Sequence, residues 1–171
     1  MLHHVSVGVA DVSRAAEFYD AVLGALGYKR TAQYLPYAIA YGEGVSEFWI
    51  QLPHDKGSAS AGNGSHFGFA AKNQDAVHRF HEAALENGAS DNGAPGPRPD
   101  YGPDYYGAFA IDPFGNRIEA VFIAAEAKRG RRRAGAKPAR KAAAKRAPAR
   151  KTKTKAKRAK ATRKRKAPRR R

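Results

Sequence analysis

The chain contains no cysteine among its 171 residues, which excludes a disulfide framework and fits a reducing compartment. It has no apolar run of about 18 residues, so no transmembrane helix is predicted. The first residues also lack the basic stretch and apolar run that mark a secretory signal. Together these absences predict a cytoplasmic protein.

Negative charge is absent from the C-terminal end of the chain. Residues 128–171 contain 24 Lys or Arg and no Asp or Glu. Of the 32 basic residues, 8 therefore lie in residues 1–127, against 15 acidic residues, which gives that part a net charge of −7. The chain thus divides into a domain over residues 1–125 and a Lys/Arg/Ala/Pro-rich segment over residues 126–171, hereafter the basic tail. Because the basic tail has almost no apolar residue other than alanine, it is predicted to be disordered on its own.

Hydrophobic periodicity predicts a strand, a helix and three more strands in the first half of the domain. Valine alternates with polar or small residues over 2–10, which is the period of a half-buried strand. A helix follows, capped by Asp11 or Ser13 and ended by glycine. Short strands are expected at 28–34, 37–42 and 46–52.

The same order of elements is predicted again after a Gly/Ser-rich linker, so the domain has two modules, at about 1–53 and 64–125. The two modules align at an offset of 62, which places His4 on His66. A Pro/Gly-rich loop is expected at 92–103, and the second strand of the later module is expected somewhere within 89–100, a range that overlaps the loop. The remaining elements are expected as strands at 65–71, 105–111 and 117–123 and a helix at about 73–87.

Two such modules, each opened by a histidine, and the Asp-Pro-x-Gly-Asn-x-x-Glu motif at residues 112–119 resemble the vicinal oxygen chelate superfamily. This superfamily includes glyoxalase I, bleomycin and fosfomycin resistance proteins and extradiol dioxygenases. The resemblance covers roughly residues 2–123, whereas the basic tail resembles linker-histone tails. It implies an α+β fold of two tandem βαβββ modules that form a half-open barrel, with metal and substrate inside the concave face. It also implies a homodimer, because members often build the cavity across two chains.

Three potential metal ligands share the strand faces that would line this cavity. If the valines of the first strand pack against the helix, His4 faces the cavity, and the same alternation places His66 and Glu119 there. The set agrees with the family pattern, in which two His and a Glu hold the metal, and Glu119 is the expected catalytic residue. Such a set suits a divalent ion such as Fe, Mn, Zn, Ni or Co. The alternative is that both histidines are ordinary strand residues and that Glu119 pairs with Arg117.

A fourth ligand is not expected, because Trp49 occupies the position in the first module that Glu119 occupies in the second. The alternative is a shifted ligand from Glu47 or Gln51, the next residues on the same strand face. Tryptophan cannot bind a metal, so Trp49 is predicted to line the substrate pocket, with a place in the core as the alternative. Glyoxalase I usually has a carboxylate at this position. An open site with three ligands therefore resembles the dioxygenase pattern more closely.

The Pro/Gly-rich stretch offers further contacts to a substrate. Such a segment has few conformations to lose, so Arg98, Tyr101 and Tyr105 are predicted to lie over the cavity mouth as anion, aromatic or proton-donating contacts. Packing of the tyrosines at the barrel rim is an equally good interpretation.

These patterns favour a metal-dependent enzyme that acts on a small oxygen-bearing substrate, either as a glyoxalase-like lyase or isomerase or as a dioxygenase. The alternative is a metal-free protein that sequesters a drug or metabolite, as bleomycin resistance proteins do. The basic tail is predicted to bind nucleic acid through phosphates without sequence preference, which would associate the protein with the nucleoid. A solubilising role or another polyanion is the alternative for the tail, and a third hypothesis makes tail binding the main function, with the domain as a dimerising handle.

Overall fold

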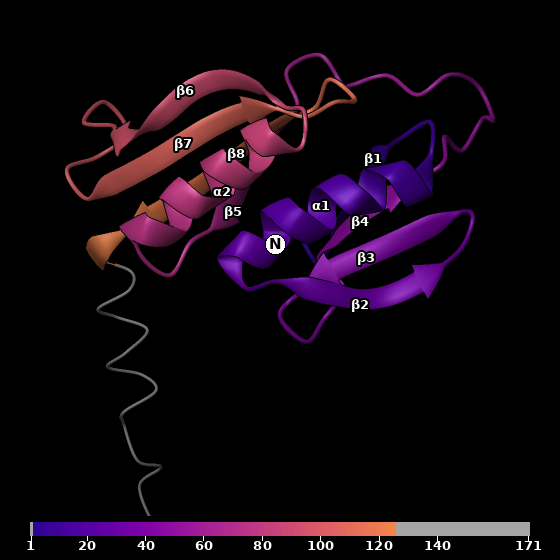
Figure 1. The fold of residues 1–171 in the computed structure, drawn as a ribbon, viewed down its shortest axis with the longest axis horizontal. Coiled ribbons are helices and arrows are strands. Elements are labelled where there is room, and N and C mark those ends of the chain that lie inside the picture. The colour runs from indigo at the N-terminus through magenta and orange to yellow at the C-terminus, as the bar shows by residue number, and fades with distance from the viewer. Residues whose placement is uncertain (1, 126–171) are drawn as a thin grey trace, which may run out of the picture. The chain divides into compact units, whose positions relative to one another are not determined.

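The structure is a computed structural model that describes residues 2–125, so the predictions for the basic tail lie outside the described residues. Ten elements follow one another in the predicted order, twice β-α-β-β-β (Figure 1). The α+β class and the two tandem βαβββ modules are therefore confirmed. The first module contains β1 (Val5–Gly8), α1 (Val12–Leu26), β2 (Lys29–Tyr34), β3 (Ala38–Gly42) and β4 (Phe48–Gln51). The second contains β5 (His66–Ala70), α2 (Gln74–Glu86), β6 (Ser90–Pro97), β7 (Tyr105–Ile111) and β8 (Arg117–Ile123).

Each module folds its four strands into one sheet, with strand orders β1-β4-β3-β2 and β5-β8-β7-β6. The first and last strands of a module are parallel neighbours, and the other neighbours are antiparallel. In the second module this pairing sets Gly68 opposite Glu119, and in the first it sets Ser6 opposite Trp49. The opening strand of each module therefore lies beside the strand that carries Glu119 or its counterpart.

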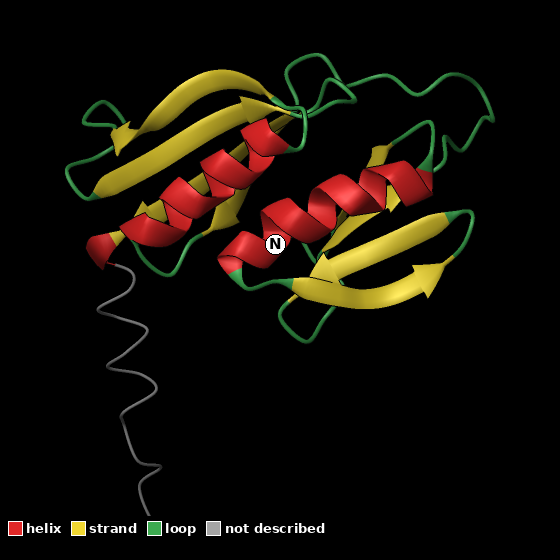
Figure 2. Ribbon diagram, in the orientation of Figure 1, coloured by secondary structure: helices red, strands yellow, loops and turns green. Residues whose placement is uncertain are grey.

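One face of each sheet is covered by the helix of its own module (Figure 2). The Asp11 side chain caps α1 by accepting hydrogen bonds from the backbone N–H groups of Ser13 and Arg14, and Gly27 ends the helix with a positive φ of 93°. Alternate strand residues face the helix, as the fully buried Ala108 and Ala110 of β7 do. The residues between them lie on the opposite face of the sheet, which no helix of the same module covers.

The Asp-Pro-x-Gly-Asn motif joins the two modules. Asp112 is buried, and its Oδ1 accepts the backbone N–H groups of Phe114 and Asn116 at 2.9 and 2.7 Å. Its Oδ2 accepts the hydroxyl of Tyr19 from α1 at 2.6 Å. Burial raises the pKa of Tyr19, so its hydroxyl remains a donor. The start of this family motif is therefore a structural turn, and only its final Glu119 reaches the site.

The expected loop over 92–103 is wrong for residues 92–97, which belong to β6. This strand is at the edge of its sheet, where proline can be accommodated because no neighbour needs its missing N–H. Irregular pairing at Gly93 and Gly96 interrupts the ladder with β7, and Gly93 has a φ of 145°. The same glycines and prolines that suggested a loop thus build a bulged edge strand. Among residues 2–125, no helix is long and apolar enough to cross a membrane.

Candidate metal and substrate site

Glu119 is the centre of the candidate site. It lies in the middle of β8, and only 5% of its surface is exposed. The hydroxyl of Tyr105 donates to Oε1 at 2.6 Å, and Nε2 of His66 lies 3.1 Å from Oε2. Among residues 2–125 no ion pair joins Glu119 to Arg117, so the alternative pairing is wrong. A buried carboxylate is thus held between an imidazole and a phenol.

Two glycines on the strands that neighbour β8 leave space for the Glu119 carboxylate. A Cβ atom at Gly107 would lie 2.8 Å from Oε1 of Glu119, and one at Gly68 would lie 3.4 Å from Oε2. The first distance is shorter than real Cβ contacts, so a larger residue at position 107 would displace the Glu119 carboxylate. Neither glycine was among the site residues predicted from the sequence. The available signal was a glycine in the middle of an otherwise apolar strand.

Tyr105 is held in its protonated form. Burial raises the pKa of its hydroxyl, and the hydrogen bond to Glu119 raises it further, because ionised tyrosine would lose the bond and face a carboxylate. The hydroxyl therefore donates to Oε1 and fixes the direction of the carboxylate.

Aromatic side chains lie around Glu119 and Tyr105 on the open face of the second sheet, with Phe109 in the middle of the group. The ring of Phe109 lies 5.7 Å from that of His66 and 6.5 Å from that of Tyr101, both edge to face. The guanidinium carbon of Arg98 lies 5.2 Å from the Phe109 centroid, and Tyr101 contacts the ring of Tyr105 at 5.3 Å. The structure thus brings five predicted site residues together around a phenylalanine that the sequence analysis missed. Its position two residues after Gly107, on the same strand face, was the available signal.

His4 and Trp49 belong to the first module. His4 precedes β1, and its Nδ1 lies 3.1 Å from Nδ1 of His3. Trp49 is half-buried on β4 and stacks on Tyr34 at 6.2 Å. Its position opposite Ser6 corresponds to that of Glu119 opposite Gly68. Among residues 2–125, no three His, Asp or Glu side chains are grouped as a metal site would require, so one chain brings His66 and Glu119 together without His4.

A cavity of about 310 Å³ opens beside His66 and is lined from both modules. Its apolar walls include Leu23 and Phe48 of the first module and Phe67 and Phe69 of the second. The ring of Phe48 lies 5.0 Å from that of Phe69, so the cavity adjoins the packed contact between the modules.

Comparison with known proteins identifies the family of the chain. Residues 1–120 match the model of the Glyoxalase/Bleomycin resistance protein/Dioxygenase superfamily. The chain belongs to this superfamily. It is 36% identical to a glyoxalase/bleomycin resistance protein from Albidiferax ferrireducens T118 of known crystal structure, with a TM-score of 0.64 over 71% of this chain and 97% of that one. No curated protein matches the chain at a significant level.

Two more distant members of known structure share the fold. A putative glyoxalase from Bacillus halodurans is 24% identical, with a TM-score of 0.55 over 71% of this chain and 94% of that one. A lactoylglutathione lyase from Agrobacterium tumefaciens is 18% identical, with a TM-score of 0.51 over 71% of this chain and 92% of that one. Members of the superfamily commonly use divalent metals, and they often bind small molecules and form dimers.

Proposed function

We propose that the chain is a metal-dependent enzyme of this superfamily that acts on a small oxygen-bearing substrate, in a glyoxalase-like lyase or isomerase reaction or as a dioxygenase. One observation carries the proposal, namely the buried carboxylate of Glu119 between His66 and Tyr105. A buried carboxylate is costly unless it is compensated, and such groups gather at functional sites.

The pair of His66 and Glu119 fits a divalent metal. Bonds from a metal to imidazole nitrogen and carboxylate oxygen are about 2.0–2.2 Å long, so two ligands of one ion lie roughly 3 Å apart. The observed separation of Nε2 and Oε2 is 3.1 Å. In this proposal His66, Glu119 and His4 hold Fe, Mn, Zn, Ni or Co, and Glu119 is the catalytic residue. When bound, the metal would act as a Lewis acid toward two substrate oxygens.

The other residues of the site position the ligands and the substrate. Tyr105 directs the Glu119 carboxylate through its hydrogen bond. Trp49 occupies the position of a fourth ligand without binding metal, and in this proposal it lines the substrate pocket together with Arg98, Tyr101 and Tyr105. The site therefore keeps positions open for substrate oxygens.

His4 is proposed to reach the site from a second copy of the chain, since one chain brings together only two of the three ligands among its described residues. Mixing two inactive variants tests this. In a dimer of His4→Ala and His66→Ala chains, one of the two shared sites would contain no substitution, so metal binding should return to half of the sites in mixed dimers. If mixing restores no binding, each site takes its ligands from one chain.

Metal titration of chelator-treated full-length protein tests the function itself. We expect one equivalent of Fe(II), Mn(II), Ni(II) or Zn(II) to bind, and His66→Ala or Glu119→Gln to abolish this binding. His54→Ala, in the linker between the modules, is the matched control and should bind normally. Absence of stoichiometric binding would favour the alternative, a metal-free protein that sequesters a drug or metabolite on the half-buried aromatic surface around Phe109.

The basic tail is proposed to bind nucleic acid non-specifically and to hold the protein at the nucleoid within the cytoplasm. The support is its charge, 24 basic and no acidic residues over 128–171, next to a domain of opposite net charge. Full-length protein should be retained on a DNA column at low salt, whereas a chain that ends at Glu126 should pass through. Equal retention of the two chains would refute the proposal.

A further inference from the structure

The open face of the second sheet places four strand positions in one row across all four strands. Strand pairing sets Gly93 of β6 opposite Phe109 of β7, Phe109 opposite Glu119 of β8, and Glu119 opposite Gly68 of β5. Neighbouring strands are about 4.8 Å apart, so Gly93 and Glu119 are separated by roughly 10 Å. This is the length of a small metabolite with a functional group at each end.

Arg98 occupies the β6 end of this row in a fixed geometry. Its Nη2 donates to the carbonyl of Ala94 at 2.7 Å, and its Nη1 donates to that of Pro97 at 3.2 Å. A Cβ atom at Gly93 would lie 3.4 Å from Nη2, and one at Gly96 would lie 3.2 Å from Nη1, so both glycines leave room for the guanidinium. The Phe109 ring lies next to it. The guanidinium is therefore held in place before any ligand arrives.

The positive charge of Arg98 has no salt-bridge partner in the part of the chain that the structure describes. No ion pair among residues 2–125 includes Arg98, although its side chain is half-buried. The two carbonyl contacts use two of the five guanidinium N–H groups, which leaves donors for a ligand. A fixed guanidinium with free donors matches the planar, bidentate geometry of a carboxylate.

We propose that Arg98 binds a carboxylate of the substrate, at the opposite end from the oxygens that meet His66 and Glu119. This proposal rests on the proposed metal site and names the substrate class, a small acid with chelating oxygens at one end and a carboxylate at the other. Phe109 lies between the two polar ends, so the middle of the substrate is apolar. Tyr101 contacts the Phe109 ring and limits the width of the substrate.

A matched pair of probes tests this, because 2-oxoadipate and 2-oxohexanoate share a chelating 2-oxo acid and differ only in a distal carboxylate or methyl group. Binding to full-length, Mn(II)-loaded protein is measured by calorimetry in about 0.2 M salt, which screens the basic tail. We expect 2-oxoadipate to bind about 10- to 100-fold more tightly than 2-oxohexanoate. In Arg98→Gln this preference should disappear, while affinities for 2-oxohexanoate and Mn(II) stay unchanged.

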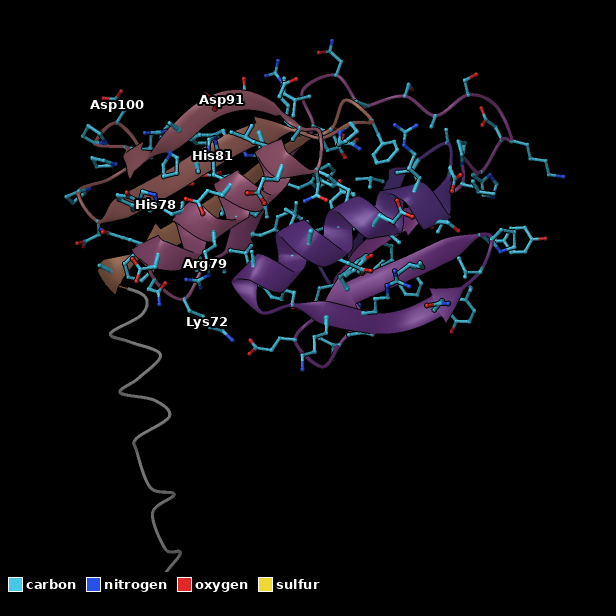
Figure 3. The ribbon with its side chains drawn as sticks, in the orientation of Figure 1. Lys72, His78, Arg79, His81, Asp91 and Asp100 are labelled. Carbon is cyan, nitrogen blue, oxygen red and sulfur yellow. The ribbon has the colours of Figure 1, made fainter. Side chains whose placement is uncertain are left out.

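Two further variants separate the role of Arg98 from charge and folding effects. Arg79→Gln on α2, labelled in Figure 3, removes the same charge from an exposed position and should keep the full preference. Arg98→Lys keeps the positive charge but lacks the planar guanidinium, so it should keep part of the preference for 2-oxoadipate. Equal affinity of the unmodified protein for both acids, or a full preference in Arg98→Gln, would overturn the proposal.

The same probes distinguish failure of this proposal from failure of the proposed function. If the protein binds no metal, the proposed function is wrong, and both acids are then measured with metal-free protein. A preference for 2-oxoadipate that depends on Arg98 would still support the carboxylate site. Its absence would overturn the site as well.

Discussion

Replacing Gly107 by alanine should weaken metal binding, because the new methyl group would occupy the space of the Glu119 carboxylate. The added Cβ would lie 2.8 Å from Oε1. Ordinary contacts begin at about 3.4 Å, so the carboxylate must move by roughly 0.6 Å. The hydroxyl of Tyr105, at 2.6 Å from the same oxygen, would lose its alignment. Displacing such a supporting contact costs about 10- to 100-fold in metal affinity.

The substitution should also cost stability, by about 1–3 kcal/mol, as extra methyl groups in packed sites do. Isothermal titration with Mn(II) gives the metal affinity, and thermal unfolding gives the stability. Gly68→Ala is the graded control, because its Cβ would lie 3.4 Å from Oε2, which is an ordinary contact. Metal affinity should remain close to normal in Gly68→Ala.

Gly24→Ala controls for the general effect of adding a methyl group, because nothing lies within 4 Å of its Cβ position. This exposed site in α1 should gain about 0.5–1 kcal/mol of stability with metal binding unchanged. If Gly107→Ala binds metal normally, or Gly68→Ala loses as much affinity, then the carboxylate does not need the space between the strands.

Three further predictions concern the module contact, the acid stability and the basic tail. Tyr19→Phe leaves Asp112 without its 2.6 Å partner in a buried network, so chemical denaturation should show a loss of about 1–3 kcal/mol, whereas Tyr37→Phe, at an exposed position, should show none. The pKa of Asp91 lies below its ordinary 3.8, mainly because the carboxylate accepts the backbone N–H of Gly93 and also because it is hydrogen-bonded to His81 of α2 (both His81 and Asp91 are labelled in Figure 3). The stabilising contribution of ionised Asp91 is therefore present above pH 3.8 and is lost as the pH falls through the lowered pKa. Asp91→Asn should accordingly unfold at a lower temperature than the unmodified protein at about pH 6, with the difference closing as the pH falls through the lowered pKa of Asp91; a difference that stays constant with pH would contradict this. If about a third of the 24 tail charges meet phosphates, roughly eight counterions are released on binding to DNA. The logarithm of the binding constant should then fall with the logarithm of the salt concentration with a slope of about −7, and a slope near zero in filter binding would exclude phosphate contacts.

Local patterns in the chain were sufficient to predict most of the fold. Alternation of apolar residues identified β1 and β8, and helical spacing with a cap at Asp11 or Ser13 and a glycine end identified α1. These signals are local, because a strand face or a helix stripe is set by residues within a few positions of each other. The edge strand β6 was partly mistaken for a loop, since its glycines and prolines satisfy a bulged edge as well as a turn.

The sequence by itself selected the residues of the second sheet that are proposed to carry its chemistry. Strand alternation and the internal repeat selected His66 and Glu119, and the structure places them 3.1 Å apart. The sequence also predicted that Trp49 occupies the position corresponding to Glu119, and the strand register agrees, because Trp49 pairs with β1 as Glu119 pairs with β5. Period and register are properties of the backbone, so they can be read from residue order.

Only the tertiary structure decided which groups meet across strands. Gly107 makes room for a carboxylate on the next strand, and Phe109 separates the imidazole of His66 from the guanidinium of Arg98. In the family motif, Asp112 accepts a hydrogen bond from Tyr19, 93 residues away in the sequence, and this contact joins the two modules. Contacts of this kind depend on how strands and modules pack, and no short-range pattern records that packing.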